Sequence, residues 1–174
     1  MSNHGLVILY TGDGKGKTTA ALGQALRAAG HGLKVCVIQF IKGKWETGEA
    51  RAMGDHLTEL VEFHTLGTGF TWKDEEDSVR EAGRKGWEFA REAVLSDRFD
   101  VVVLDELTYL VNYGIVAEFE VLDLLNRRPK RQHVVITGRG ASRPLIDAAD
   151  LATEMREIKH PYQNGVKAQK GVEF

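Results

Sequence analysis

The sequence predicts an α/β fold in which a mostly parallel central sheet carries helices on both of its faces. Short apolar runs alternate with longer helical patterns along the chain. These runs are apolar throughout rather than at every second residue, which is typical of strands buried on both faces. A glycine-rich segment, Thr11–Thr19, joins the first apolar run to the first helical pattern. Together these features predict a P-loop NTPase-like, RecA-like architecture.

The expected strands are the short runs of valine, isoleucine and leucine. In chain order they are Leu6–Tyr10, Val35–Phe40, Val61–Thr65, Val101–Leu104, His133–Thr137 and a sixth candidate, Thr153–Lys159. The expected helices are Lys17–Ala29, Glu49–Gly54, Asp74–Leu95, Ala117–Asn126 and a segment from about Ser142. The tail from His160 to Phe174 has no clear period.

The first and third of these helices have the clearest signals. Lys17–Ala29 is rich in alanine and ends at Gly30, a residue that commonly terminates helices. In Asp74–Leu95 the apolar and small residues recur at steps of three and four, which makes one apolar face. This helix opens with four acidic residues, which suit the positive end of the helix dipole.

Length and composition limit the possible functions. A chain of 174 residues fits a single domain, taken as 1–174. The 23 basic and 25 acidic residues leave a net charge of −2, which argues against a broad nucleic-acid-binding surface. The single cysteine, Cys36, and the lack of an apolar run of ~20 residues predict a cytoplasmic protein without a membrane span.

The strongest chemical signal is the segment that leads into the first helix. Glycines at alternate positions let backbone N–H groups face a phosphate chain, and the helix adds the positive end of its dipole. Lys17 would neutralise phosphate charge, and the Thr18 hydroxyl would ligate the Mg²⁺ that accompanies ATP. The strict motif has glycine where this chain has Thr11. The expected nucleotide-binding residues are Gly12, Asp13, Gly14, Lys15, Gly16, Lys17, Thr18 and Thr19.

Two carboxylates at the end of a buried strand are the second signal. Asp105 and Glu106 follow Val101–Leu104, and a carboxylate in this place commonly supports magnesium beside a phosphate loop. If the strand continues through them, the two side chains point to opposite sides and have different roles. One would hold the metal directly or through water, and the other would position the loop.

Other candidates are less specific. Phe70 and Trp72 lie between glycines in a loop at the expected ligand edge, where they either form a hydrophobic wall for a flat ligand or anchor the loop. Arg139 follows a strand at the same edge, and Arg27 lies on the first helix; both are candidate nucleotide contacts. The basic turn Arg127–Arg131 is either solvated or contacts an acidic partner or the polar rim of a ligand.

Six segments together resemble the P-loop ATP:corrinoid adenosyltransferases of cobalamin biosynthesis and salvage. They are Thr11–Thr19, Gln39–Gly43, Gly69–Trp72, Leu104–Tyr109, Ile136–Gly140 and Val166–Gln169, and the resemblance runs from about Gly5 to Phe174. Members of this family often carry an N-terminal extension that covers the active site, whereas this chain begins almost at its first strand.

The resemblance implies transfer of the 5′-deoxyadenosyl group of ATP to cob(I)alamin or a precursor corrinoid, with release of triphosphate. It implies that ATP lies reversed in the loop, that Thr18 and Glu106 support Mg²⁺, and that Phe70 and Trp72 displace the lower axial base of the corrinoid. With Lys17, these give the expected catalytic set Lys17, Glu106, Phe70 and Trp72. The implied partners are a reductant such as a flavoprotein and a second copy of the chain in a homodimer.

Other P-loop functions remain open from the residues alone. A motor-like or recombinase-like ATPase would use Glu106 to orient water and would release orthophosphate. A small kinase would release ADP and would use Arg127–Arg131 as a lid, and a nucleotide-binding regulator would release no product.

Overall fold

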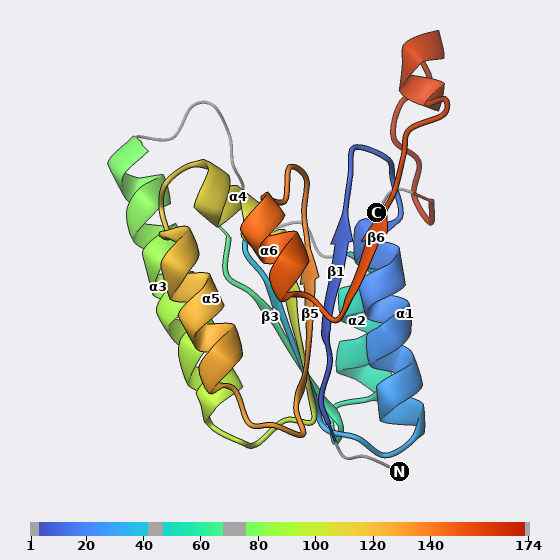
Figure 1. Cartoon of the computed structure of the whole chain (residues 1–174). Helices are drawn as coiled ribbons and strands as arrows, with labels where there is room; N and C mark the ends of the chain where they lie inside the picture. Colours follow the sequence, from blue (N-terminus) through green and yellow to red (C-terminus); the bar gives the residue numbers. More distant parts are fainter. Residues whose placement is uncertain (1–3, 42–46, 68–75, 173–174) are drawn as a thin grey trace.

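A computed structural model describes residues 4–41, 47–67 and 76–172. Six parallel strands form one sheet in the order β3-β2-β4-β5-β1-β6 (Figure 1). The strands are β1 Val7–Thr11, β2 Val35–Gln39, β3 Val61–Thr65, β4 Val101–Asp105, β5 His133–Thr137 and β6 Leu151–Glu154. The helices are α1 Lys17–Gly30, α2 Gly48–His56, α3 Glu76–Leu95, α4 Leu107–Asn112, α5 Glu118–Arg127 and α6 Arg143–Ala148, followed by the 3₁₀ helix η1 Pro161–Asn164. The expectation of a parallel sheet between helices is confirmed.

Two hydrophobic cores flank the sheet. Helices α1 and α2 cover one face, and α3, α5 and α6 cover the other (Figure 1). In β4, Val101 and Val103 face the α1 side, whereas Val102 and Leu104 face the α3 side. Because both sets are buried, every position of a central strand is apolar, which explains the continuous runs in the sequence.

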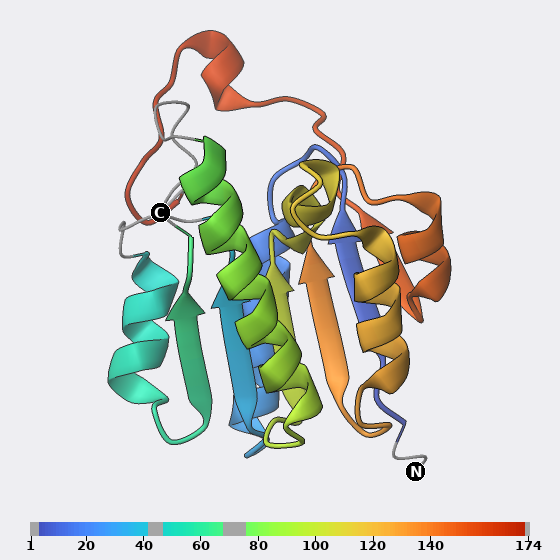
Figure 2. The same ribbon diagram turned by 90° about the vertical axis from the view of Figure 1, so that its left-hand side faces the viewer.

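All six strands point their carboxyl ends toward one edge of the sheet (Figure 2). The segment between β1 and α1 lies at this edge, and the C-terminal segment with η1 rises above it (Figures 1 and 2). Ligands of open parallel sheets bind at this edge. Across the described ranges, no helix combines the length and the apolarity that a membrane crossing requires.

The structure departs from the expected elements at β6 and at α4. The sixth strand was expected at Thr153–Lys159, but β6 spans Leu151–Glu154. All four of its residues are exposed, so no apolar run marks this edge strand in the sequence. Its position depends instead on its backbone pairing with β1 and on two hydrogen bonds just before it. Asp150 N–H donates to the Val7 carbonyl, and the Asp150 carboxylate accepts from Val7 N–H at 2.7 Å.

The second difference is α4, a helix of six residues that was not expected. It begins directly after β4, because Glu106 adopts the left-handed conformation with φ 65° and ψ 27° and turns the chain out of the strand. The strand therefore ends at Asp105 and does not continue through Glu106, so the alternation of side chains expected for a continued strand does not apply. Six residues are too few to show a helical period.

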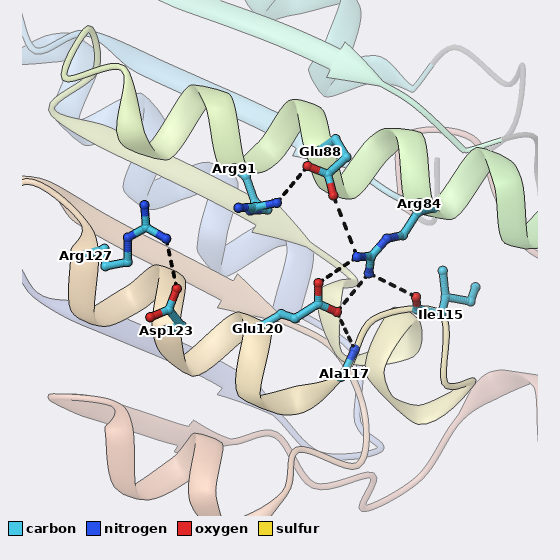
Figure 3. A network of polar contacts seen from close by, with 8 residues as sticks. All are labelled: Arg84, Glu88, Arg91, Ile115, Ala117, Glu120, Asp123 and Arg127. Carbon is cyan, nitrogen blue, oxygen red and sulfur yellow. Dashed lines mark hydrogen bonds and ion pairs between the residues drawn. The ribbon is translucent and has the colours of Figure 1, made fainter.

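An ion-pair network connects α3 to α5 (Figure 3). The Arg84 guanidinium makes two hydrogen bonds to Glu120, at 2.8 and 2.7 Å, and Glu120 also accepts from Ala117 N–H at the start of α5. The hydrogen bonds from Arg84 lower the pKa of Glu120 to about 2 from its ordinary value of 4.5. The bidentate geometry makes this pair stronger than an ordinary surface ion pair.

We expect Glu120→Gln to lower the free energy of unfolding by about 1 kcal/mol at neutral pH, because the pair is partly exposed to solvent. Since the pKa of Glu120 is depressed in the folded protein, the ion pair contributes its full share to the free energy of unfolding above pH 4.5. This contribution is lost as the pH falls toward about 2. Urea denaturation of both proteins at several pH values measures this.

The matched control is Glu81→Gln, which removes an exposed ion pair with Lys85 within α3. It is expected to have a smaller effect than Glu120→Gln at neutral pH. A Glu120→Gln difference that does not shrink as the pH falls from 4.5 would show that the ion pair is not its cause.

Candidate active site

The segment between β1 and α1 forms a closed turn around the Lys17 ammonium. Lys17 Nζ donates to the carbonyls of Gly12 at 2.7 Å and Gly14 at 2.8 Å, and only 6% of the residue is exposed. Gly16 takes the left-handed conformation, with φ 107°, at the helix N-cap position. The helix therefore begins at Lys17 with its free N–H groups at the carboxyl edge of the sheet.

The charge of Lys17 responds to several neighbours. Burial lowers the pKa of its ammonium below 10.5, and the carboxylate of Glu106 opposes this most strongly. Arg139 also lowers the pKa, whereas Asp13 and Asp105 raise it. Lys17, Glu106, Arg139 and Asp105 thus lie close enough to influence one another, as expected for one site.

A segment expected as part of the sixth strand, and not as part of the site, crosses the outside of this turn. Met155 N–H donates to the Thr11 carbonyl at 2.8 Å, and Gly14 N–H donates to the Met155 carbonyl at 2.7 Å. A Cβ atom at Gly14 would lie 2.7 Å from the carbonyl carbon of Arg156, and one at Gly12 would clash with the Met155 backbone. Gly12 and Gly14 therefore make room for the chain after β6. We call Met155–Arg156 the strap.

Asp105 is a fully buried carboxylate at the end of β4. Its Oδ1 accepts from the Thr18 hydroxyl at 2.9 Å and from the Thr137 hydroxyl at 2.7 Å, and its Oδ2 accepts from Gln39 Nε2 at 2.8 Å. All three of these donors, two hydroxyls and one amide, are uncharged. Burial of a carboxylate is costly unless such hydrogen bonds replace its water. Asp105 therefore links β4 to α1, β5 and β2.

Glu106 occupies the turn between β4 and α4. Its backbone N–H donates to the Thr137 hydroxyl at 2.8 Å. Tyr109 lies one turn further on; burial, and then the charge of Glu106, raise the pKa of its hydroxyl. The ring of Tyr109 stacks on that of Tyr113 with centroids 6.0 Å apart.

The loop after β5 is tied to α4. The Arg139 carbonyl accepts from the Thr108 hydroxyl at 2.7 Å and from Asn112 Nδ2 at 3.1 Å. These bonds hold the backbone of Arg139 at the carboxyl edge and leave its side chain exposed. Arg139 is therefore in place as a candidate phosphate contact.

The structure brings together most of the predicted site residues. Gly12–Gly16 form the turn, on which Asp13 and Lys15 are exposed, and Thr19 is exposed at the start of α1. The turn is accompanied by Lys17, Thr18, Asp105, Glu106 and Arg139. Arg27 is not brought there: it lies in the last turn of α1, about 15 Å along the helix axis from Lys17. Phe70 and Trp72 lie outside the described residues.

The basic turn Arg127–Arg131 lies at the opposite edge of the sheet, because it precedes β5. The glycine-rich turn follows β1, which is parallel to β5. Arg127 pairs with Asp123, Arg128 donates to the Gly5 and Leu125 carbonyls, and Arg131 pairs with Asp97. The interpretation of this turn as a kinase lid is wrong for this geometry.

Thr137 and Gln39 were not predicted as site residues. Both are polar residues that end an apolar strand run, and both are buried, as is Asp105 in the strand between them. A polar residue at the carboxyl end of a buried strand is the signal that could have identified them. No comparable signal marks Met155, whose contribution is mostly made by its backbone.

A parallel sheet, a glycine-bearing turn that leads into a helix, a buried lysine on that turn and a carboxylate on a neighbouring strand define a P-loop nucleotide-binding protein. The protein-family model for "ATP:corrinoid adenosyltransferase BtuR/CobO/CobP" matches residues 3–174. The chain belongs to this family of enzymes, which adenosylate corrinoids with ATP.

Relatives with known names agree. The chain is 47% identical over 171 residues to a corrinoid adenosyltransferase of Escherichia coli (strain K12), covering 98% of this chain and 86% of the relative. It is 46% identical, with the same coverage, to the corrinoid adenosyltransferase CobA of Salmonella typhimurium. It is 44% identical over 172 residues to a corrinoid adenosyltransferase of Pseudomonas aeruginosa, covering 98% and 84%.

The fold is shared more widely than the sequence. The flagellar accessory protein FlaH from Methanocaldococcus jannaschii superimposes with a TM-score of 0.59 at 12% identity, covering 87% of this chain and 71% of that protein. This likeness supports the P-loop NTPase-like fold class predicted from the sequence.

The strap generates a prediction for Gly14. Because a Cβ atom at Gly14 meets the backbone of Met155 and Arg156, Gly14→Ala should lower the free energy of unfolding by about 1–3 kcal/mol and weaken ATP binding. Gly23→Ala is the control, since a Cβ atom there meets nothing within 4 Å; in the interior of α1 it should stabilise by about 0.5–1 kcal/mol. Urea denaturation and calorimetric titration with ATP measure both. Unchanged stability in Gly14→Ala would contradict the strap contact.

Proposed function

We propose that the chain transfers the 5′-deoxyadenosyl group of ATP to the cobalt(I) of a corrinoid. The cobalt of the substrate attacks the 5′-carbon with its electron pair, a cobalt–carbon bond forms, and the bond from the 5′-carbon to the triphosphate oxygen breaks. The leaving triphosphate takes the bonding electron pair, and cobalt goes formally from Co(I) to Co(III). The observation that carries the proposal is the P-loop site with Lys17 and two carboxylates, in a chain of this family.

This reaction does not require a general base, because cobalt(I) carries no proton to be removed. It requires stabilisation of the negative charge on the leaving triphosphate. The Lys17 ammonium and the free N–H groups at the start of α1 are the groups in place to do this. The carboxylates of Glu106, Asp13 and Asp105 favour the charged form of Lys17 and offset part of the pKa decrease that burial causes.

The side chains also fit a Mg²⁺ ion bound with ATP. Mg²⁺ sites of this type use one or two protein oxygens and complete their coordination with phosphates and water. Within the described residues, no three His, Cys, Asp or Glu residues gather into a metal site, so substrate oxygens would be needed. When bound, Mg²⁺ would supply neutralising charge to the triphosphate.

The hydrogen bonds suggest a division of roles. Both Asp105 oxygens already accept from protein donors, so we propose that Asp105 orients the Thr18 hydroxyl instead of binding the metal directly. The Thr18 hydroxyl donates a hydrogen bond to Asp105, which leaves the lone pairs of the Thr18 oxygen for a cation. Glu106 is then the carboxylate proposed to hold Mg²⁺.

We propose that Phe70 and Trp72 form the wall that displaces the lower axial base of the corrinoid. This proposal rests on the resemblance of the segment Gly69–Trp72 to the family, since Phe70 and Trp72 lie outside the described residues. The same ground supports cob(I)alamin or a precursor as substrate, a reductant such as a flavoprotein, and a homodimer. The cytoplasm, which holds ATP and keeps a lone cysteine reduced, is the proposed location.

The reaction is tested by its products. Incubation of ATP labelled in the adenosine and in the γ-phosphate with chemically reduced corrinoid should yield labelled adenosylcorrinoid and intact triphosphate. Lys17→Ala, which removes a charge from the phosphate site, should reduce this turnover at least ~100-fold. Orthophosphate released without corrinoid would indicate an ATPase, and ADP would indicate a kinase.

For the metal, we expect Glu106→Gln to reduce the increase in turnover that Mg²⁺ produces by about 10–100-fold. Corrinoid binding should stay nearly unchanged. The substitution removes charge and keeps shape. Turnover as a function of Mg²⁺ concentration, together with corrinoid binding followed by absorbance, measures both. If Asp105→Asn changes the Mg²⁺ dependence more than Glu106→Gln does, while ATP binding without Mg²⁺ stays unchanged, the two proposed roles are reversed.

For the aromatic pair, we expect Phe70→Ala combined with Trp72→Ala to leave ATP affinity intact. Turnover with cobalt(II) and a weak reductant should be lost, because the lower axial base stays bound and cobalt(II) with this base bound is difficult to reduce. Turnover with pre-reduced cobalt(I) should survive in part, and the bound corrinoid should show a five-coordinate spectrum. Equal loss of both activities, or loss of ATP binding, would show that the pair anchors the loop.

A further inference from the structure

We propose that Thr137, at the carboxyl end of β5, is a positioning residue that couples the placement of Glu106 to Asp105 and Thr18. The inference rests on the proposed roles of Thr18 and Glu106 toward Mg²⁺, and assigns to Thr137 the task of setting their relative positions. Thr137 itself is not placed in contact with metal or nucleotide.

The direction of each hydrogen bond follows from the groups involved. A hydroxyl has one proton and two lone pairs. The Thr137 hydroxyl donates a hydrogen bond to Asp105 Oδ1 at 2.7 Å, because a carboxylate can only accept. The same hydroxyl accepts a hydrogen bond from the Glu106 N–H at 2.8 Å. The same Asp105 oxygen accepts from Thr18 at 2.9 Å. One chain of hydrogen bonds therefore joins the Glu106 backbone to the Thr18 side chain, and each bond polarises the next.

Glu106 needs this support because its backbone is in an uncommon conformation. It is one of two described non-glycine residues with positive φ, and the turn it forms starts α4 without a side-chain cap. An L residue adopts this conformation at a cost, which the surrounding structure has to offset. The hydrogen bond from Glu106 N–H to Thr137 stabilises the turn at the residue where it is strained.

Thr137 is itself held rigidly. It is fully buried, and it is paired in register with Tyr10 of β1. The next residue, Gly138, packs so tightly on α4 that a Cβ atom there would clash with the Thr108 hydroxyl. The hydroxyl of Thr137 is therefore fixed from both sides, which is the property a positioning residue requires.

The test compares Thr137→Val, which keeps the shape and removes the hydroxyl, with Thr137→Ser, which keeps the hydroxyl. The ATP dissociation constant is measured by calorimetry with and without Mg²⁺, without any corrinoid. We expect Thr137→Val to reduce the Mg²⁺-dependent gain in ATP affinity by about 10–100-fold and to change Mg²⁺-free binding much less. Thr137→Ser should retain the gain.

A second readout is hydrogen exchange at the Glu106 amide, measured by NMR in the free protein. The amide should be protected in the natural chain and in Thr137→Ser, and should exchange faster in Thr137→Val. Equal losses of ATP affinity with and without Mg²⁺ would show a merely structural role and overturn the proposal. So would a retained Mg²⁺ effect in Thr137→Val, or loss of the Mg²⁺ effect in Thr137→Ser.

Two features keep the test decisive. If Thr137→Val does not fold, rapid exchange of the Glu106 amide in the natural chain is by itself enough to overturn the proposal, and slow exchange supports it. Because no corrinoid is present, failure of the proposed adenosyl transfer would leave these binding measurements unaffected, and it would be detected separately by the product analysis.

Discussion

The site depends on one buried carboxylate. Asp105 has no exposed surface, and its charge is stabilised by hydroxyl and amide donors from α1, β5 and β2. Each donor is fixed on a different element, so the elements have to meet in one arrangement for the carboxylate to be satisfied. The same arrangement places Thr18 beside the turn that holds Lys17 and places Glu106 at the start of α4. Both the fold and the site therefore require that the buried Asp105 carboxylate be hydrogen-bonded by these donors.

The backbone at the edge of the sheet adds a second constraint. The sequence motif explains the alternate glycines of the turn between β1 and α1 as space for phosphate, but the structure gives Gly12 and Gly14 a further reason. The strap crosses directly over them, and its Met155 carbonyl takes the Gly14 N–H. The turn is thus held from outside by the strap that follows β6 and from inside by the Lys17 ammonium, which is bound to the Gly12 and Gly14 carbonyls.

The sequence was most informative where one short segment contains the whole signal. Val101–Leu104 reads as a buried strand because both of its faces are covered, and Thr11–Thr19 carries its chemistry within nine consecutive residues. Prediction was weaker where the signal depends on distant partners. Exposed β6 is positioned by backbone bonds to β1, α4 is created by a left-handed turn at Glu106, and Thr137 acquires its role from residues 31 and 32 positions away.

The most direct test of the central role of Asp105 is the free energy of unfolding of Asp105→Ala, measured together with Mg²⁺-free ATP affinity. The substitution leaves three donors around a cavity without their acceptor. We expect a loss of stability of at least about 3 kcal/mol and a marked loss of ATP affinity even without Mg²⁺. A variant with the stability and the Mg²⁺-free ATP affinity of the natural chain would contradict the account, because Asp105 would then not organise the site.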